Sequence, residues 1–88
     1  MTIVWTGQFK KDHKRARKQG RNLADLRSVI ERLAAHEPLP PNRRDHSLCG
    51  RWSKHRECHL APDWLLIYRI DGDDLILERI GSHAELFG

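Results

Sequence analysis

The spacing of apolar residues in the first half of the chain is typical of helices. One stripe, about three turns long, recurs every three or four positions and consists of Leu23, Leu26, Val29, Ile30, Leu33 and Ala34. Phe9, His13 and Ala16 show the same spacing just before it. Thr6 can cap that earlier helix with its hydroxyl, and Gly20 can end it in a left-handed turn. Residues 22–25, which begin with Asn22, fit a variant of the capping pattern at the start of the later helix. The pattern therefore predicts two consecutive helices.

The remaining apolar runs have the length and composition of strands. Ile3-Val4-Trp5 is a short β-prone run before the helices. Three more runs, residues 51–60, 65–70 and 75–80, follow the proline-rich segment 37–42. That segment lacks the amide donors that a helix or a central strand needs, so it marks the crossover between the two halves. These runs predict a sheet built mainly from the second half of the chain.

The hairpin between the last two runs decides which side chains share a face of the sheet. Its loop is Asp71-Gly72-Asp73-Asp74, across which we expect Ile70 to pair with Leu75. One face would then carry Leu66, Tyr68, Leu75, Leu77 and Arg79. The other would carry Leu65, Ile67, Arg69, Ile76, Glu78 and Ile80, with Arg69 and Glu78 in diagonal reach. Because both faces hold large apolar groups, we expect both to be at least partly covered.

Together these elements predict an α+β fold in the order β-α-α-β-β-β, with two N-terminal helices packed on a small, mostly antiparallel sheet. The final segment, residues 81–88, is long enough only for a single helical turn. No repeat or linker divides the chain, and 88 residues lie near the lower end of what folds alone. We therefore expect one domain over residues 1–88.

Composition and charge point towards a polyanionic partner. Hydrophobic residues make up 39% of the chain and charged residues 32%, which is typical of a globular protein. The formal net charge is +4, and residues 10–21 hold seven bases against one acid. Such a run suits nucleic acid, although a solvated helix face would have the same composition.

Several classes of protein are disfavoured. Cys49 and Cys58 form no CxxC motif, so neither a disulfide framework nor a zinc ribbon is expected. The N-terminal run is too short and too polar for a signal peptide, and no apolar stretch approaches the ~20 residues of a membrane span. We expect a cytoplasmic protein without a membrane partner.

The candidate chemistry lies in the histidines of the second half. His46, His55, His59 and His83 surround the expected strands, and Asp63 follows Pro62 in an expected turn. Imidazole can give or take a proton near neutral pH, so two histidines and a carboxylate suffice for RNA scission. The 2′-hydroxyl must lose a proton, the leaving 5′-oxygen must gain one, and an Arg or Lys can stabilise the phosphate between these events. This scheme requires neither metal nor cofactor.

Less specific interpretations exist for each of these residues. A histidine can be an ordinary surface residue, Asp63 can simply cap its turn, and Trp52 and Trp64 can be core aromatics, although a tryptophan on an active face could stack on an RNA base. Zinc binding is disfavoured because residues four apart on a strand, such as His55 and His59, lie about 13 Å from each other.

Three linked motifs then narrow the choice. Residues 45–52 follow the pattern DHxLxGxW, residues 56–68 follow RxxHxxPDWxLIY, and residues 79–87 follow RxG[ST]HxxLF. These spaced motifs, which run through about half of the chain, resemble the YafQ family of toxins from type II toxin–antitoxin systems, within the RelE superfamily. The resemblance implies a RelE-like fold and a ribosome-dependent messenger RNA (mRNA) endoribonuclease.

The resemblance also implies roles for individual residues. The positions that match the acid–base group of the family are His46, His59, Asp63 and His83. Trp64 and Phe87 match positions associated with activity beside that group, and we expect both to contact the RNA. We expect His83 to be the general acid, and the base stays open among His46, His59 and Asp63. Charge and position add Arg56 and Arg79 as candidates for phosphate stabilisation.

The resemblance further implies the partners. These are the ribosome, mRNA and a small acidic antitoxin with a helical segment over the active face, and operator DNA is contacted only through the antitoxin complex. Cys58 stands where the family has a small residue, and both it and Cys49 could make activity sensitive to oxidation. Two alternatives remain: a non-enzymatic ParE-like toxin that binds gyrase, and a basic nucleic-acid-binding module that uses the helix at residues 10–19.

Overall fold

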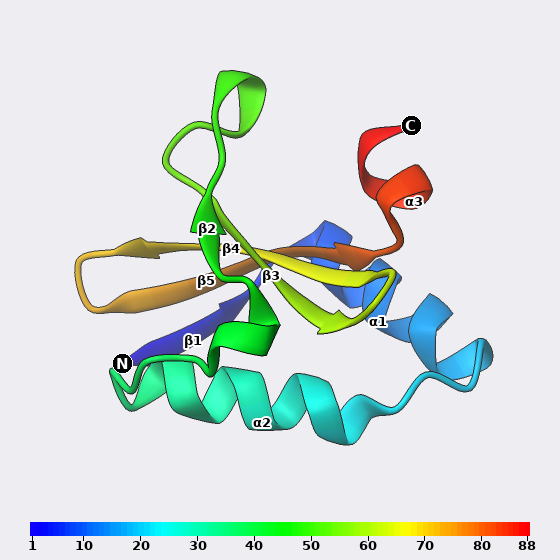
Figure 1. The fold of residues 1–88 in the computed structure, drawn as a ribbon, viewed down its shortest axis with the longest axis horizontal. Helices are drawn as coiled ribbons and strands as arrows, with labels where there is room; N and C mark the ends of the chain where they lie inside the picture. The colour runs from blue at the N-terminus through cyan, green and yellow to red at the C-terminus, as the bar shows by residue number, and fades with distance from the viewer.

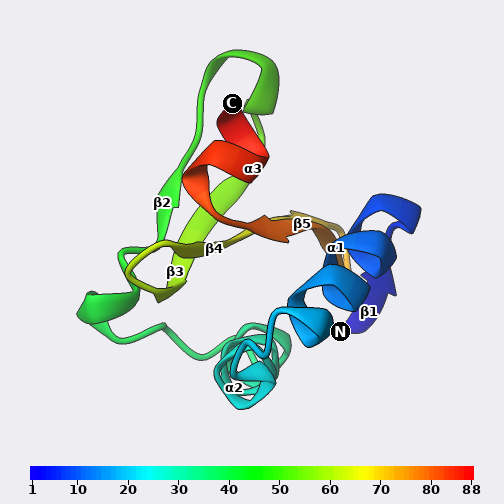
Figure 2. The ribbon, with the colours of Figure 1, turned by 90° about the vertical axis from the view of Figure 1, so that its right-hand side faces the viewer.

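A computed structural model describes residues 1–88 and shows a five-stranded sheet with two long helices on one face and a short helix on the other (Figures 1 and 2). The elements are β1 (Thr2–Trp5), α1 (Gly7–Lys18), α2 (Leu23–Ala34), β2 (His46–Ser47), β3 (Arg56–Ala61), β4 (Trp64–Asp71), β5 (Asp74–Gly81) and α3 (His83–Phe87). The strand order is β1-β5-β4-β3-β2, and only the β1–β5 pair is parallel. The predicted α+β fold is confirmed. No helix is long and apolar enough to cross a membrane.

Both long helices begin and end where the sequence predicts. The Thr6 hydroxyl accepts a hydrogen bond from the Phe9 amide at 3.0 Å and so caps α1. Gly20 has a φ of 72° just after α1, which is a conformation that L side chains rarely adopt. The Asn22 side chain caps α2 by accepting from the Ala24 amide at 3.0 Å.

The prediction of one strand over residues 51–60 is wrong in its first half. Residues Gly50–Trp52 form a short 3-10 helix, and β3 begins only at Arg56. The reason is local backbone geometry, since Gly50 and Lys54 both have a positive φ and cannot continue a strand. The chain therefore makes an excursion between the two-residue strand β2 and β3.

The predicted hairpin register holds at its loop and shifts further along. Ile70 pairs with Leu75 as predicted, but a bulge changes the partners so that Tyr68 faces Leu77 and Ile67 faces Arg79. One residue of β5 is therefore extra, and every later residue of that strand changes face. Ile80, predicted on the opposite face, packs in the same core as Tyr68. The face assigned to Arg79 is wrong for the same reason.

The two faces of the sheet carry separate apolar clusters. The helix-side core joins α1 and α2 to the sheet through Phe9, Ala16, Leu26, Val29, Leu33, Cys58, Leu60, Trp64, Leu66, Tyr68, Leu75, Leu77 and Ile80. On the opposite face, Leu65, Ile67 and Leu86 pack with the partly buried Leu48 and Trp52. The expectation that both faces are covered is therefore confirmed. The second face is only lightly covered, which leaves room for a site.

Beyond the end of β1, helix α1 contacts the edge of β5. β1 stops at Trp5, opposite Leu77, so the later backbone groups of β5 have no strand partner on that side. The carboxylate of Asp12 accepts the Ile80 amide at 3.2 Å and two hydrogen bonds from Arg79 at 2.7 and 3.1 Å. Asp12 is only 1% exposed. The single acid of the basic stretch is thus a buried structural anchor.

Replacing Asp12 by alanine tests this anchor. We expect Asp12→Ala to lower the free energy of unfolding by about 2–4 kcal/mol, because it leaves the Ile80 amide without a hydrogen-bond acceptor and Arg79 without its carboxylate. Lys14→Ala, at an exposed position of the same helix with no ion pair, should change it by less than about 0.5 kcal/mol. Urea denaturation followed by circular dichroism gives both values. Equal stability of the two variants would contradict the anchoring role.

Candidate active site

The four predicted acid–base residues gather on the face of the sheet opposite α1 and α2. Cys58 and Leu60 of β3 point into the helix-side core, so the alternating positions Glu57 and His59 point to the other face. His46 in β2 pairs with Glu57, and His59 pairs with Leu65 of β4. Leu65 in turn pairs with Gly81 of β5, two residues before His83. The sheet register therefore brings three distant segments together.

His83 and Asp63 form a hydrogen-bonded pair. Asp63 lies in the turn between β3 and β4 and accepts from the His83 backbone amide at 3.0 Å and from its Nδ1 at 2.9 Å. These bonds hold the pKa of the Asp63 carboxyl below its ordinary value, so it stays ionised through the neutral range. His83 is the first residue of α3, whose start is fixed by a reciprocal capping box of Ser82 and Glu85. The pair leaves Nε2 of His83 free.

A buried carboxylate links the other two histidines. Oε1 of Glu57 lies 3.7 Å from Nε2 of His46 and 3.8 Å from Nε2 of His59, and Glu57 is only 5% exposed. Nδ1 of His46 donates to the Arg44 carbonyl at 2.7 Å, so its Nε2 carries the lone pair when the ring is neutral. The rings of His59 and His83 have centroids 6.0 Å apart. Glu57 was not among the residues predicted from the sequence, although its position two before His59 on a strand indicates a shared face.

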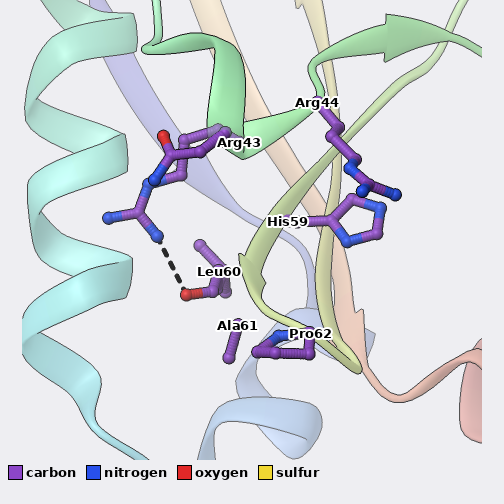
Figure 3. A pocket seen from close by; sticks show the side chains of 7 residues that line it. Arg43, Arg44, His59, Leu60, Ala61 and Pro62 are labelled. Carbon is purple, nitrogen blue, oxygen red and sulfur yellow. Dashed lines mark hydrogen bonds between the residues drawn. The ribbon is translucent and has the colours of Figure 1, made fainter.

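A cationic pocket adjoins His59. Its volume is about 450 Å³, and it is lined by Asn42, Arg43, Arg44, His59, Leu60, Ala61 and Pro62. Figure 3 shows the Arg44 guanidinium beside the His59 ring, while Arg43 is directed towards α2 and donates to the Leu60 carbonyl at 2.9 Å. Arg44 is exposed and pairs with no carboxylate. Its charge is therefore available to an anion.

Three of the predicted RNA-contacting residues do not join this cluster. Strand alternation places Arg56 and Trp64 on the helix side, where Trp64 is 2% exposed beneath the Arg21 guanidinium. Arg56 is held by the Asp45 carboxylate, and Arg79 is held by Asp12. Both arginines thus already pair with a carboxylate, and Trp64 is buried. The structure gives all three a packing or pairing role.

Phe87 is the predicted contact that does reach the cluster. Its ring is 44% exposed, and its centroid lies 6.2 Å from that of His83, one helical turn away. His55, left unassigned by the sequence, lies apart: its ring contacts the Glu78 carboxylate at 2.8 Å and the Ser53 carbonyl at 3.0 Å. No group of three or more His, Cys, Asp or Glu side chains is arranged to hold a metal ion.

The chain is similar to known proteins along almost its whole length. Residues 1–88 match the family described as bacterial toxin of type II toxin–antitoxin system, YafQ. The mRNA interferase toxin YafQ of Escherichia coli K12 is 40% identical over 98% of this chain and 95% of its own length. The toxin in the crystal structure of the E. coli DinJ–YafQ complex has a TM-score of 0.91 and 40% identity, covering 98% of this chain and 97% of its own.

A second crystal structure is similar along its whole length. The copper-bound mutant toxin from Helicobacter pylori has a TM-score of 0.95 and 41% identity, and the match covers 99% of each chain. The copper is a property of that toxin. In the present chain no three His, Cys, Asp or Glu side chains are arranged to hold a metal ion, so no chemical step is assigned to a metal.

The two cysteines should differ sharply in reactivity. Burial raises the pKa of the Cys58 thiol to about 12, so it stays protonated at neutral pH, whereas Cys49 is exposed. We expect the native protein to react with one equivalent of a maleimide at pH 7.5 and the urea-unfolded protein to react with two. Cys49→Ser should abolish the native reaction. Reaction of two thiols in the native protein would contradict the burial of Cys58.

Proposed function

The chain belongs to the YafQ family of toxins from type II toxin–antitoxin systems, and we propose that it is an endoribonuclease that cuts mRNA on the ribosome by histidine acid–base catalysis. The observation that carries the proposal is the hydrogen-bonded His83–Asp63 pair, which lies beside His59 and the His46–Glu57 pair on an open face. The name mRNA interferase, which the E. coli relative bears, supports the same activity.

His83 fits the role of the general acid. Asp63 holds its Nδ1–H, so the protonated ring presents Nε2–H to the substrate. That proton passes to the 5′-oxygen as the bond from phosphorus to this oxygen breaks. Asp63 already accepts two hydrogen bonds from His83, so its role is to position and charge-stabilise the ring.

His46 fits the role of the general base. The bond from its Nδ1–H to the Arg44 carbonyl leaves the lone pair on Nε2, ready for the proton of the 2′-hydroxyl. The 2′-oxygen then bonds to phosphorus, and the products are a 2′,3′-cyclic phosphate and a 5′-hydroxyl. Glu57, at 3.7 Å, stabilises the imidazolium that forms. His59, between base and acid, is placed to hydrogen-bond the phosphate.

Arg44 takes the role that the sequence analysis assigned to Arg56 and Arg79. Its guanidinium lines the same pocket as His59 and has no carboxylate to neutralise it. A phosphate that gains negative charge during attack is stabilised by a fixed cation at this position. The left-handed backbone of Arg44, with a φ of 51°, also turns its carbonyl to His46. One residue thus serves both the base and the phosphate.

The remaining surfaces fit the partners of such a toxin. The exposed residues of α1 include Lys10, Lys11, Lys14, Arg17 and Lys18, none of them in an ion pair, and this basic surface suits ribosomal RNA. The E. coli relative has been crystallised with DinJ. We propose that a cognate acidic antitoxin with a helical segment covers the active face of this chain, and that operator DNA is contacted only through that complex.

Replacing His83 tests the catalytic assignment. We expect His83→Ala to cut mRNA on translating ribosomes about 10²- to 10⁴-fold more slowly, with an unchanged unfolding midpoint because the side chain is 55% exposed. The matched control is His36→Asn, at an exposed position outside the site whose φ of 59° suits asparagine. The wild-type reaction should persist with a chelator that removes zinc and copper but leaves the Mg²⁺ that the ribosome needs. Full cleavage by His83→Ala, or inhibition of gyrase with intact message, would refute the proposal.

A second pair of variants separates Arg44 from the arginines chosen on sequence. Arg44→Asn, which suits the positive φ, should slow cleavage about 10- to 100-fold, and Arg44→Lys should restore part of the rate because it keeps the charge. Arg56→Gln should cut at nearly the wild-type rate, since Asp45 already neutralises Arg56. Single-turnover rates with translating ribosomes measure all three. If Arg56→Gln cut more slowly than Arg44→Asn, stabilisation of the phosphate would be assigned to Arg56 instead.

A further inference from the structure

An apolar pocket lies next to the catalytic cluster and has no role in the mechanism above. Its volume is about 510 Å³, and it is lined by Leu48, Cys49, Arg51, Trp52, Leu86, Phe87 and Gly88. The walls are α3 and the excursion between β2 and β3, which rise from the same face of the sheet (Figures 1 and 2). Leu86, together with Leu65 and Ile67, anchors this apolar cluster on the sheet.

The lining of this pocket has the chemistry of a nucleobase site. Phe87 is 44% exposed and Trp52 is half-buried, so aromatic surface is available for stacking. Arg51 is exposed, forms no ion pair and can contact a phosphate at the rim. No acidic residue lines the pocket, which favours a polyanionic ligand over a basic peptide.

Its position identifies which nucleotide it would hold. Phe87 follows His83 by one turn of α3, and the two ring centroids are 6.2 Å apart. His83 donates to the leaving 5′-oxygen, which belongs to the nucleotide on the 3′ side of the cut. That nucleotide is therefore the one that passes closest to Phe87. His46, which serves the 2′-hydroxyl on the 5′ side, lies on β2 and is not among the lining residues.

We propose that this pocket, between α3 and residues 48–52, binds the base of the nucleotide directly 3′ of the cleaved bond and so sets the sequence preference of the enzyme. The proposal rests on the proposed function, and in particular on His83 as the acid. A stacked base would hold the scissile phosphate in register with His83, so its loss should slow cleavage and relax the choice of site.

Cys49 allows the pocket to be filled without a destabilising substitution. It lines the pocket and is exposed, whereas Cys58 is buried and unreactive. We expect N-phenylmaleimide on Cys49 to slow cleavage about 10-fold or more and to change the positions cut, and the small S-methyl adduct to have a much smaller effect on both. Cys49→Ser treated with the same maleimide is the control. Unaltered rate and positions after the bulky adduct would overturn the proposal.

An mRNA with an abasic nucleotide tests which nucleotide the pocket binds. We expect an abasic nucleotide 3′ of the cut to slow the wild type about 10-fold or more and the Phe87→Leu variant much less, because the two changes remove the same contact. Lys54→Asn, outside this pocket, should behave as the wild type. If the unmodified protein cuts no message, the proposed function itself fails. If the N-phenylmaleimide adduct of Cys49 cleaves normally but is inhibited less by an acidic antitoxin, the pocket would be assigned to the antitoxin instead.

Discussion

The buried carboxylate of Asp12 holds together the corner of the molecule from which the proposed catalytic face is built. It binds Arg79 and the amide of Ile80, which lie just before the end of β5 and the start of α3. Arg15, one turn further along α1, pairs with Glu85 of α3 at 3.2 Å. A Cβ on Gly81 would lie 3.1 Å from Arg15, so the glycine of the third motif permits this close approach. α1 therefore fixes the place where His83 enters the site.

The alternation of side chains along the strands separates stability from chemistry. Residues of β3 and β4 that face the helices build the main core, and their immediate neighbours in sequence face the site. Burial against α1 and α2 is the dominant stabilising contribution, since the second apolar cluster is small. The proposed catalytic face can therefore carry exposed imidazoles and an open pocket with little loss in the free energy of unfolding. His59 and Trp64 illustrate the division, because they are five residues apart and point to opposite faces.

Fixed tautomers explain how the imidazoles of His46 and His83 could take different roles. A backbone carbonyl holds Nδ1–H of His46, and a carboxylate holds Nδ1–H of His83. The first environment favours accepting a proton at Nε2, and the second stabilises a charged ring that can donate one. Glu57 adds a buried negative charge on the side of the base. Asp63 is remote from His83 in sequence, whereas Arg44 lies two residues before His46 and Glu57 lies two residues before His59.

The sequence by itself determined most of the elements and singled out most residues of the candidate site. Helical spacing, the caps at Thr6 and Asn22 and the hairpin loop are local features, and the spaced motifs single out the histidines and Asp63. Only the tertiary structure decided which charges are free. Arg79 and Asp12 are 67 residues apart, and a bulge in β5 moves Ile80 to the other face, so no local pattern could show that Arg79 is neutralised. The physical reason is that a side chain's availability depends on its partner across the fold, and the partner is chosen by strand register.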